Sequence, residues 1–147
     1  MDMSNAEYAA LVKRLAPKSN LLADTLRAFL VGGLICVLGQ LLLMLYASWG
    51  AGEDAAASWC SITLIFLSAL LTGLGVYDDI AKFAGAGSLV PITGFANSVA
   101  APALEFKTEG FITGTAAKMF VIAGPVIVYG ASAGVVYGLL LLLLGAT

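Results

Sequence analysis

The chain has 147 residues, of which 61% are hydrophobic and 11% charged, and its formal net charge is −2. Soluble domains carry about 25% charged residues, so this composition excludes a soluble protein and predicts one all-α integral membrane domain over residues 1–147. The small negative charge gives no reason to expect nucleic acid as a partner. The chain has no histidine, the commonest general base and metal ligand, and we expect neither a bound metal nor a cofactor.

A short amphipathic helix is expected within residues 1–20. Ser4 and Glu7 match the Ser-x-x-Glu capping box. Apolar side chains then recur at helical spacing, at Tyr8, Leu11, Val12 and Leu15, and Pro17 follows them. The stripe favours a helix that lies on the cytoplasmic surface of the membrane, with docking onto a partner protein as the alternative.

Two apolar segments, 28–49 and 57–77, are each long enough to cross a bilayer. The loop between them carries two acidic residues and no lysine or arginine, whereas four basic residues precede the first segment. The positive-inside rule therefore places the N terminus in the cytoplasm. No cleavable signal peptide is expected, because the first 27 residues are polar and the apolar run that follows is long enough to span.

The segment 83–104 is apolar enough to span, but four residues argue against one uninterrupted helix: Gly85, Gly87, Pro91 and Gly94. Irregular backbone is stable at membrane depth only inside protein or against water. We therefore favour a broken, re-entrant segment that returns to the cytoplasmic side and leaves the C terminus outside. An ordinary glycine-rich third span is the alternative, and it would place the C terminus inside.

The last apolar run, 111–145, is longer than one span needs. As a straight helix from Phe111 to the end of the chain it would reach roughly 55 Å, well past the ~30 Å hydrocarbon core. Proline disrupts a helix, so a kink is predicted at Gly124–Pro125, with two half-helices or a projecting end as alternatives. The chain is thus expected to hold three to four transmembrane helices.

Polar residues in the broken segment are the first candidates for a solute path, namely Ser88, Thr93, Asn97 and Ser98. Uncharged dipoles can replace the water of a solute without holding it too tightly. Lys118 is the second candidate, because in a helix that begins near Gly110 it lies about 12 Å along, close to mid-membrane. A lysine there is costly and is expected to face a path for an anionic solute, with snorkelling as the alternative.

Two further groups of residues are candidates for the mouth of the path and for assembly. The acidic residues Asp78, Asp79, Glu105 and Glu109 are predicted to form a cytoplasmic mouth that meets a divalent cation, or else to be solvated loop charges. Gly130, Gly134 and Gly138 are four residues apart and predict close helix packing. Their partner could be the same chain, a second copy or another protein.

Signals of catalysis are missing from the sequence. The segment "GAGSLV" lacks the third glycine of a dinucleotide fingerprint and follows no strand, and we find no nucleophile, metal or kinase motif. We therefore expect a protein that is not an enzyme.

Three blocks of the sequence resemble a known family. "FLVGGLICVLGQ" (29–40), "LTGLGVYD" (71–78) and "FAGAGSLVPITGFANSV" (83–99) are similar to blocks in the stage V sporulation protein A membrane subunits of spore-forming bacteria. The polar N-terminal extension "YAALVKRLAPKS" (8–19), with "APALEFKTEG" (101–110) and "KMFVIAGPVIVYG" (118–130), favours the AC type of subunit over the AE type.

The resemblance implies a function that composition alone does not. These subunits belong to a complex in the inner membrane of the forespore and spore, which moves dipicolinic acid, with calcium, during sporulation and germination. An AE-type membrane subunit and an AD-type peripheral subunit would be partners, and self-association is expected because so small a chain cannot enclose a pore alone. A mechanosensitive channel on its own and a non-conducting scaffold are the alternatives. The family supplies no pore residues that can be carried over.

Overall fold

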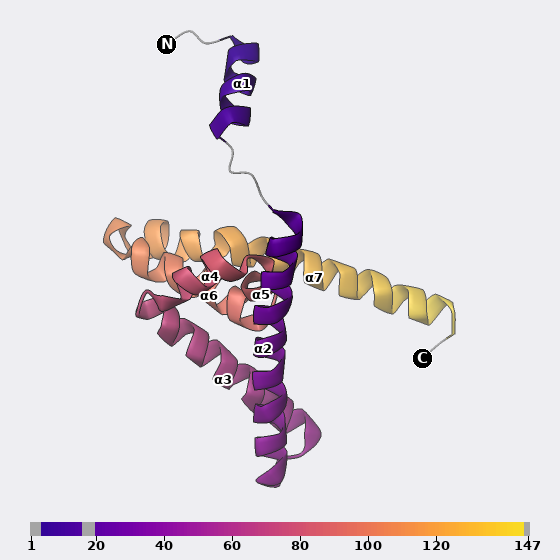
Figure 1. Cartoon of the computed structure of the whole chain (residues 1–147). Coiled ribbons are helices and arrows are strands. Elements are labelled where there is room, and N and C mark those ends of the chain that lie inside the picture. The colour runs from indigo at the N-terminus through magenta and orange to yellow at the C-terminus, as the bar shows by residue number, and fades with distance from the viewer. Residues whose placement is uncertain (1–3, 16–19, 146–147) are drawn as a thin grey trace.

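The computed structural model describes residues 4–15 and 20–145, and all regular structure in these ranges is helical (Figure 1). The helices are α1 (Asn5–Leu15), α2 (Leu21–Ser48), α3 (Glu53–Gly73), α4 (Val76–Ala84), α5 (Ala86–Leu89), α6 (Ile92–Glu105), the 3-10 turn η1 (Lys107–Glu109), the π-helical η2 (Phe111–Ala116) and α7 (Ala117–Leu143). The prediction of an all-α membrane protein is confirmed. Pro17, named above, lies outside the described residues, and so does the very end of the chain.

Three helical stretches in the described part are long and apolar enough to cross a membrane: Leu21–Ser48, Glu53–Gly73 and Phe111–Leu143. The first two form the legs of a V that is joined by a short turn (Figure 1). Across this turn, Tyr46 Oη lies 2.6 Å from Thr63 Oγ1, and the Tyr46 ring packs edge-on against Trp59. Aromatic side chains with a polar end are typical of a membrane–water interface, which fits the turn as the far end of the first two spans.

Helix α3 ends earlier than the sequence pattern predicted for the second span. Gly75 adopts a φ of 73°, a left-handed conformation that glycine tolerates and that ends the helix beyond Gly73. Tyr77 was expected near the end of a span, but it lies in α4 and is only 3% exposed. Its hydroxyl donates to the Ser88 carbonyl at 2.8 Å, so this tyrosine ties α4 to α5 rather than marking a membrane interface.

The segment 83–104 is broken, as the sequence predicted. Gly85, with φ of 53°, separates α4 from α5, and the extended Pro91 separates α5 from α6. Proline has no backbone N–H, so it is suited to the start of α6. Helices α4, α5 and α6 are each shorter than a membrane span, which is compatible with a re-entrant course of the segment. That course itself remains a prediction.

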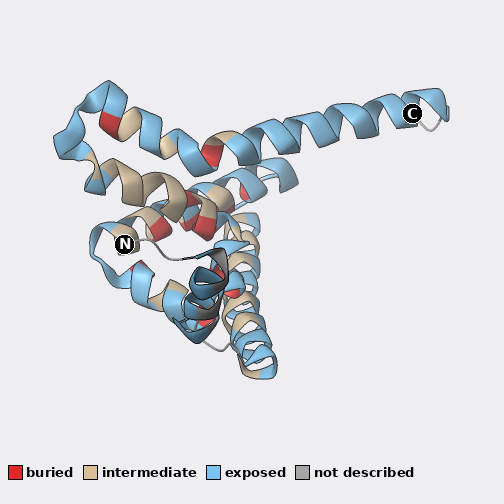
Figure 2. Ribbon diagram, turned by 90° about the horizontal axis from the view of Figure 1, so that it is seen from above, coloured by how far each residue is buried: buried red, intermediate tan, exposed pale blue. Residues whose placement is uncertain are grey.

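Glycines allow the broken segment to pack closely. A Cβ added to Gly87 on α5 would lie 2.2 Å from the Ala28 carbonyl oxygen on α2, and Gly32 lies on the other side of the same contact. Helix α6 packs mainly on α3, and the buried residues gather where these elements meet (Figure 2). The core is small, and many large apolar side chains of the described residues are exposed.

Helix α7 continues through Pro125 without interruption, so the alternative of two separate half-helices is not observed. Its first half packs on α6, whereas residues 125–140 are all exposed. Figures 1 and 2 show this second half extending away from the rest of the chain, and α7 runs crosswise to α2. Within the described chain, the second half of α7 therefore has little to pack against.

Candidate functional site

A line of polar residues joins α3 to α6, and we call it the polar seam. Ser68 and Thr72 on α3 face Thr93 and Asn97 on α6, and both pairs have the four-residue spacing that puts side chains on one helix face. Ser68 Oγ donates to the Thr93 carbonyl oxygen at 2.6 Å, and Thr72 Oγ1 lies 2.8 Å from Asn97 Oδ1. The seam thus brings two of the predicted path residues together.

The polar seam contains hydrogen-bonding groups that are not used within the chain. Thr93 is 7% exposed, and its Oγ1 has no hydrogen-bond partner among the described residues. Buried polar atoms nearly always have a partner, so this one requires an explanation. Asn97 is only partly buried, and the one hydrogen bond of its side-chain amide among the described residues is with the Thr72 hydroxyl. Asn97 therefore keeps hydrogen-bonding capacity for a group from outside the chain, whereas Thr93 Oγ1 is covered by neighbouring atoms.

The two serines predicted to line the path lie outside the seam. Ser88 is fully buried, its Oγ donates to the Gly85 carbonyl oxygen at 3.2 Å, and its own carbonyl accepts from Tyr77. Ser98 Oγ donates to the Phe95 carbonyl oxygen at 2.7 Å, within α6. Both hydroxyls stabilise local backbone in this arrangement.

Lys118 lies near the start of α7 and is exposed. Its Nζ stands 4.8 Å from the centroid of the Phe106 ring, a cation–π distance, and no salt bridge with it is found among the described residues. This contact attaches α7 to the end of α6. The structure does not bring Lys118 into contact with the polar seam.

The predicted acidic mouth is divided into two places in the single chain. On α4, Lys82 Nζ lies 2.6 Å from Asp78 and 3.5 Å from Asp79. The hydrogen bond to Asp78, followed by the charge of the same carboxylate, raises the pKa of Lys82. Glu105 lies at the C-terminal end of α6 and Glu109 in the η1 turn that follows, and both are exposed. In the part of the chain that is described, no three acidic residues gather to hold a metal ion.

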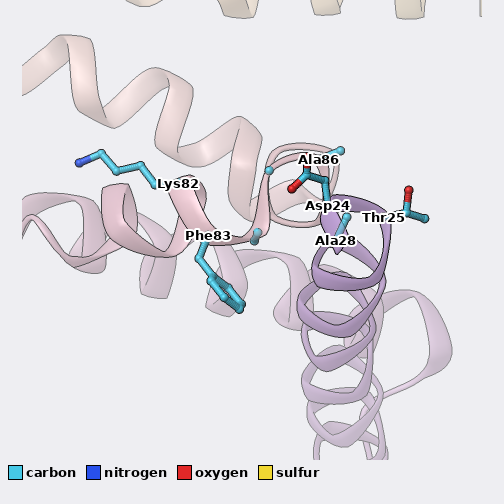
Figure 3. Close-up of a pocket in the computed structure, with 8 residues that line it drawn as sticks. Asp24, Thr25, Ala28, Lys82, Phe83 and Ala86 are labelled. Carbon is cyan, nitrogen blue, oxygen red and sulfur yellow. The ribbon is translucent and has the colours of Figure 1, made fainter. Parts of the chain in front are cut away.

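A charged hollow of about 590 Å³ lies beside α4, close to the N-terminal end of α2 (Figure 3). Asp24 and Thr25 of α2 line one side, and Lys82 and Phe83 of α4 line the other, with Lys82 extending away from α2. The Arg27 guanidinium lies 5.3 Å from the Phe83 ring centroid and also pairs with Asp24 at 3.7 Å. The charges of α4 therefore lie at the same end of the molecule as the start of α2, as the predicted topology requires.

The glycines predicted to pack helices do not pack closely against any of the described residues. A Cβ added at Gly130, Gly134 or Gly138 would meet nothing within 4 Å. Among the described residues, close packing falls instead on Gly32, Gly87, Gly94 and Gly114. A packing partner for the α7 glycines would thus have to come from outside the described chain, and it stays a prediction.

Sequence reasoning missed Ser68 and Thr72, half of the polar seam. Both lie within the apolar segment 57–77, which was predicted as the second span. The available signal was their four-residue spacing, which matches the spacing of Thr93 and Asn97 and predicts two polar faces that can meet.

These features define the class of protein first: an all-α integral membrane protein in which a polar seam crosses the packing between a spanning-length helix and a broken segment. The chain belongs to the SpoVAC/SpoVAEB sporulation membrane protein family, whose sequence profile matches residues 24–140. It is 49% identical over 134 residues to stage V sporulation protein AC of Bacillus subtilis (strain 168), a match that covers 90% of this chain and 89% of the relative. The resemblance inferred from the three sequence blocks is confirmed. No solved structure shows a significant match.

Proposed function

We propose that this chain is a membrane subunit of a multi-protein channel or transporter that moves dipicolinic acid, with calcium, across the inner spore membrane during sporulation and germination. The observation that carries the proposal is the polar seam, with its partly buried Asn97 amide, which makes one hydrogen bond among the described residues. Membership of a sporulation membrane protein family supports it. The choice of dipicolinic acid as the solute rests on the resemblance to the stage V sporulation protein A subunits.

The chemistry of the seam suits the proposed solute. Dipicolinate is a small planar dianion whose carboxylates accept hydrogen bonds. The Asn97 amide can donate to such a group and carries no charge that would trap it. The exposed carboxylates of Asp78 and Asp79 would meet the accompanying calcium at the cytoplasmic mouth, since calcium prefers oxygen ligands.

An assembly is needed for this function, because one chain of this size does not enclose a pore. We propose AE-type and AD-type subunits, and further copies of this chain, as partners in the inner membrane of the forespore and spore, with the N terminus in the cytoplasm. In the assembly, the polar seam would open toward a shared path. The exposed second half of α7 offers a surface through which partners can attach.

Removing the seam's hydrogen-bonding groups tests the function. Asn97→Leu and Thr72→Val are expected to lower dipicolinic acid flux several-fold in sporulating cells while the complex still assembles. Ser61→Ala is the control, because Ser61 Oγ donates only within its own helix, to the Ala57 carbonyl oxygen. Flux is measured as dipicolinic acid accumulated per spore, and assembly by co-purification. Normal flux in both seam variants would count decisively against a path at this seam.

A non-conducting scaffold is the second candidate, and the long unpartnered stretch of α7 favours it. A scaffold would lose partner binding when α7 is altered and would tolerate polar-to-apolar changes in the seam. The same seam variants therefore separate the two functions.

A further inference from the structure

An apolar cavity of about 350 Å³ lies where α2 and α3 diverge, and we call it the α2–α3 crevice. It is separate from the charged hollow and shares no lining residue with it. Residues of α2 and α3 form its sides, and α4 and α6 contribute to its floor. Both side walls belong to helices of spanning length, so the crevice is expected to face the hydrocarbon of the bilayer.

The crevice changes from exposed at its rim to buried at its floor. Leu34 on α2 is 68% exposed and Leu70 on α3 is 48% exposed, whereas Leu64 and Tyr77 are 8% and 3% exposed. A cavity with this gradient opens sideways, between the two spans, rather than toward either aqueous face. A molecule that enters the crevice from this side comes from the surrounding lipid.

The hydroxyl groups around the floor offer no accessible hydrogen-bonding atom to a polar ligand. Tyr77 Oη is committed to the Ser88 carbonyl, and Ser68 Oγ is committed to the Thr93 carbonyl. Thr93 Oγ1 has no partner, but it is covered by neighbouring atoms. Water in a cavity needs two to four polar partners, so this crevice is unsuited to water and to a dianion alike.

The size of the crevice further restricts the class of molecule that can bind in it. A cavity of about 350 Å³ that opens between two spans can admit a thin apolar chain from the surrounding lipid. An acyl chain is thin, flexible and apolar. Leaving the crevice empty would forfeit the dispersion contacts of its lining. We propose that the α2–α3 crevice binds an acyl chain of a membrane phospholipid, which enters sideways between the two spans.

Photo-crosslinking tests the proposal on the full-length chain. The protein is reconstituted in phosphatidylglycerol vesicles that contain a phosphatidylglycerol with a diazirine near the end of one acyl chain. After irradiation, the modified residues are located by mass spectrometry. We expect adducts on the floor residues Leu64 and Tyr77 as well as on Phe66, which is 64% exposed on α3 and reports lipid at the outer surface.

A variant that fills the crevice should remove only the floor adducts. Ile35→Trp places a large side chain in the lining, and Leu67→Trp does so from the other wall. Val37→Trp is the matched control, since Val37 lies on the same helix, is exposed and does not line the crevice. The ratio of Tyr77 to Phe66 adducts should fall several-fold in the filling variants and stay unchanged in the control.

Two results would overturn the proposal. One is labelling of Phe66 without labelling of the floor in the unaltered protein, a pattern that occupation of the crevice by another protein chain would also give. The other is persistence of the floor adducts when the crevice is filled. The first result is measured on the unaltered protein, so it can overturn the proposal even if a filling variant fails to fold.

Discussion

Gly87 is the residue on which the packing of the broken segment against α2 most depends. Its Cα faces the backbone of Ala28, and an added Cβ would lie 2.2 Å from that carbonyl oxygen. Backbone cannot move aside as the end of a flexible side chain can. The sequence predicted that Gly87 disfavours a continuous helix, but the contact with Ala28 joins residues far apart in the chain and has no local signal.

Gly87→Ala is expected to destabilise the chain by about 1–3 kcal/mol, the usual cost of overpacking a well-packed contact. Gly33→Ala is the control, since a Cβ at Gly33 on α2 would meet nothing within 4 Å. Thermal unfolding of the purified proteins in detergent measures both. Equal melting temperatures for the two variants would show that the close approach at Gly87 does not hold the fold.

The capping box at Ser4 and Glu7 was predicted from the sequence and is confirmed by the structure. The Ser4 backbone N–H and Oγ each donate to Glu7 Oε2 at 2.9 Å. The backbone hydrogen bond, followed by the side-chain bond, lowers the pKa of Glu7 from its ordinary value of 4.5. A local four-residue pattern sufficed here, because all the partners lie within one helical turn.

The stabilisation that this cap gives to α1 should depend on pH. Because the pKa of Glu7 is lower in the folded helix, the contribution is fully present above about 4.5 and is lost as the pH falls through the folded-state value. The amide resonance of Ser4, followed by NMR in micelles, is expected to titrate with a midpoint below 4.5. Glu7→Gln should abolish that titration. A midpoint at or above the ordinary value would argue that the cap does not form.

At the scale of elements, the contacts of α7 with the other described helices fall on its first half. Residues 125–140 are exposed, and they include the glycines at 130, 134 and 138. A face of small residues lets helix backbones approach closely in a membrane. The sequence indicated this face, and the described chain places nothing against it, so a packing partner there stays a prediction.

Gly134→Leu is expected to weaken association with partner subunits several-fold without lowering the melting temperature of the isolated chain, since a Cβ added at Gly134 would meet nothing within 4 Å. Ser132→Leu is the control, because two residues along a helix point to nearly opposite sides. Co-purification of the complex from sporulating cells measures association. An equal loss for both variants would indicate a general effect of bulk on α7 rather than a packing face.

The broken segment shows where sequence reasoning succeeds and where it fails. Gly85 and Pro91 were predicted to interrupt the helix, and they do, since their backbone properties act locally. The end of α3 at Gly73 was missed, because "LTGLGVY" reads as a continuing apolar span. Tyr77 was misplaced for a similar reason: only its tertiary partner, the Ser88 carbonyl, shows that it is buried.

At the scale of the whole molecule, the three helical stretches of spanning length favour three crossings, with residues 83–104 turning back. With a cytoplasmic N terminus, three crossings place the end of α7 outside. In the single chain α7 runs crosswise to α2, so we expect partner subunits to bring it upright beside the other spans (Figure 1). Composition alone predicted the class of this molecule, whereas we expect the orientation of α7 to depend on the assembly.

The side of the membrane reached by the end of α7 tests the re-entrant course most directly. Cys36 and Cys60 are replaced by alanine, and a single cysteine is introduced by Gly145→Cys or, as the cytoplasmic reference, by Asp79→Cys. A membrane-impermeant maleimide is then applied to intact forespore-membrane vesicles of known orientation, with the full complex present. The account predicts that the two positions are labelled from opposite sides. Labelling of both from the same side would contradict it.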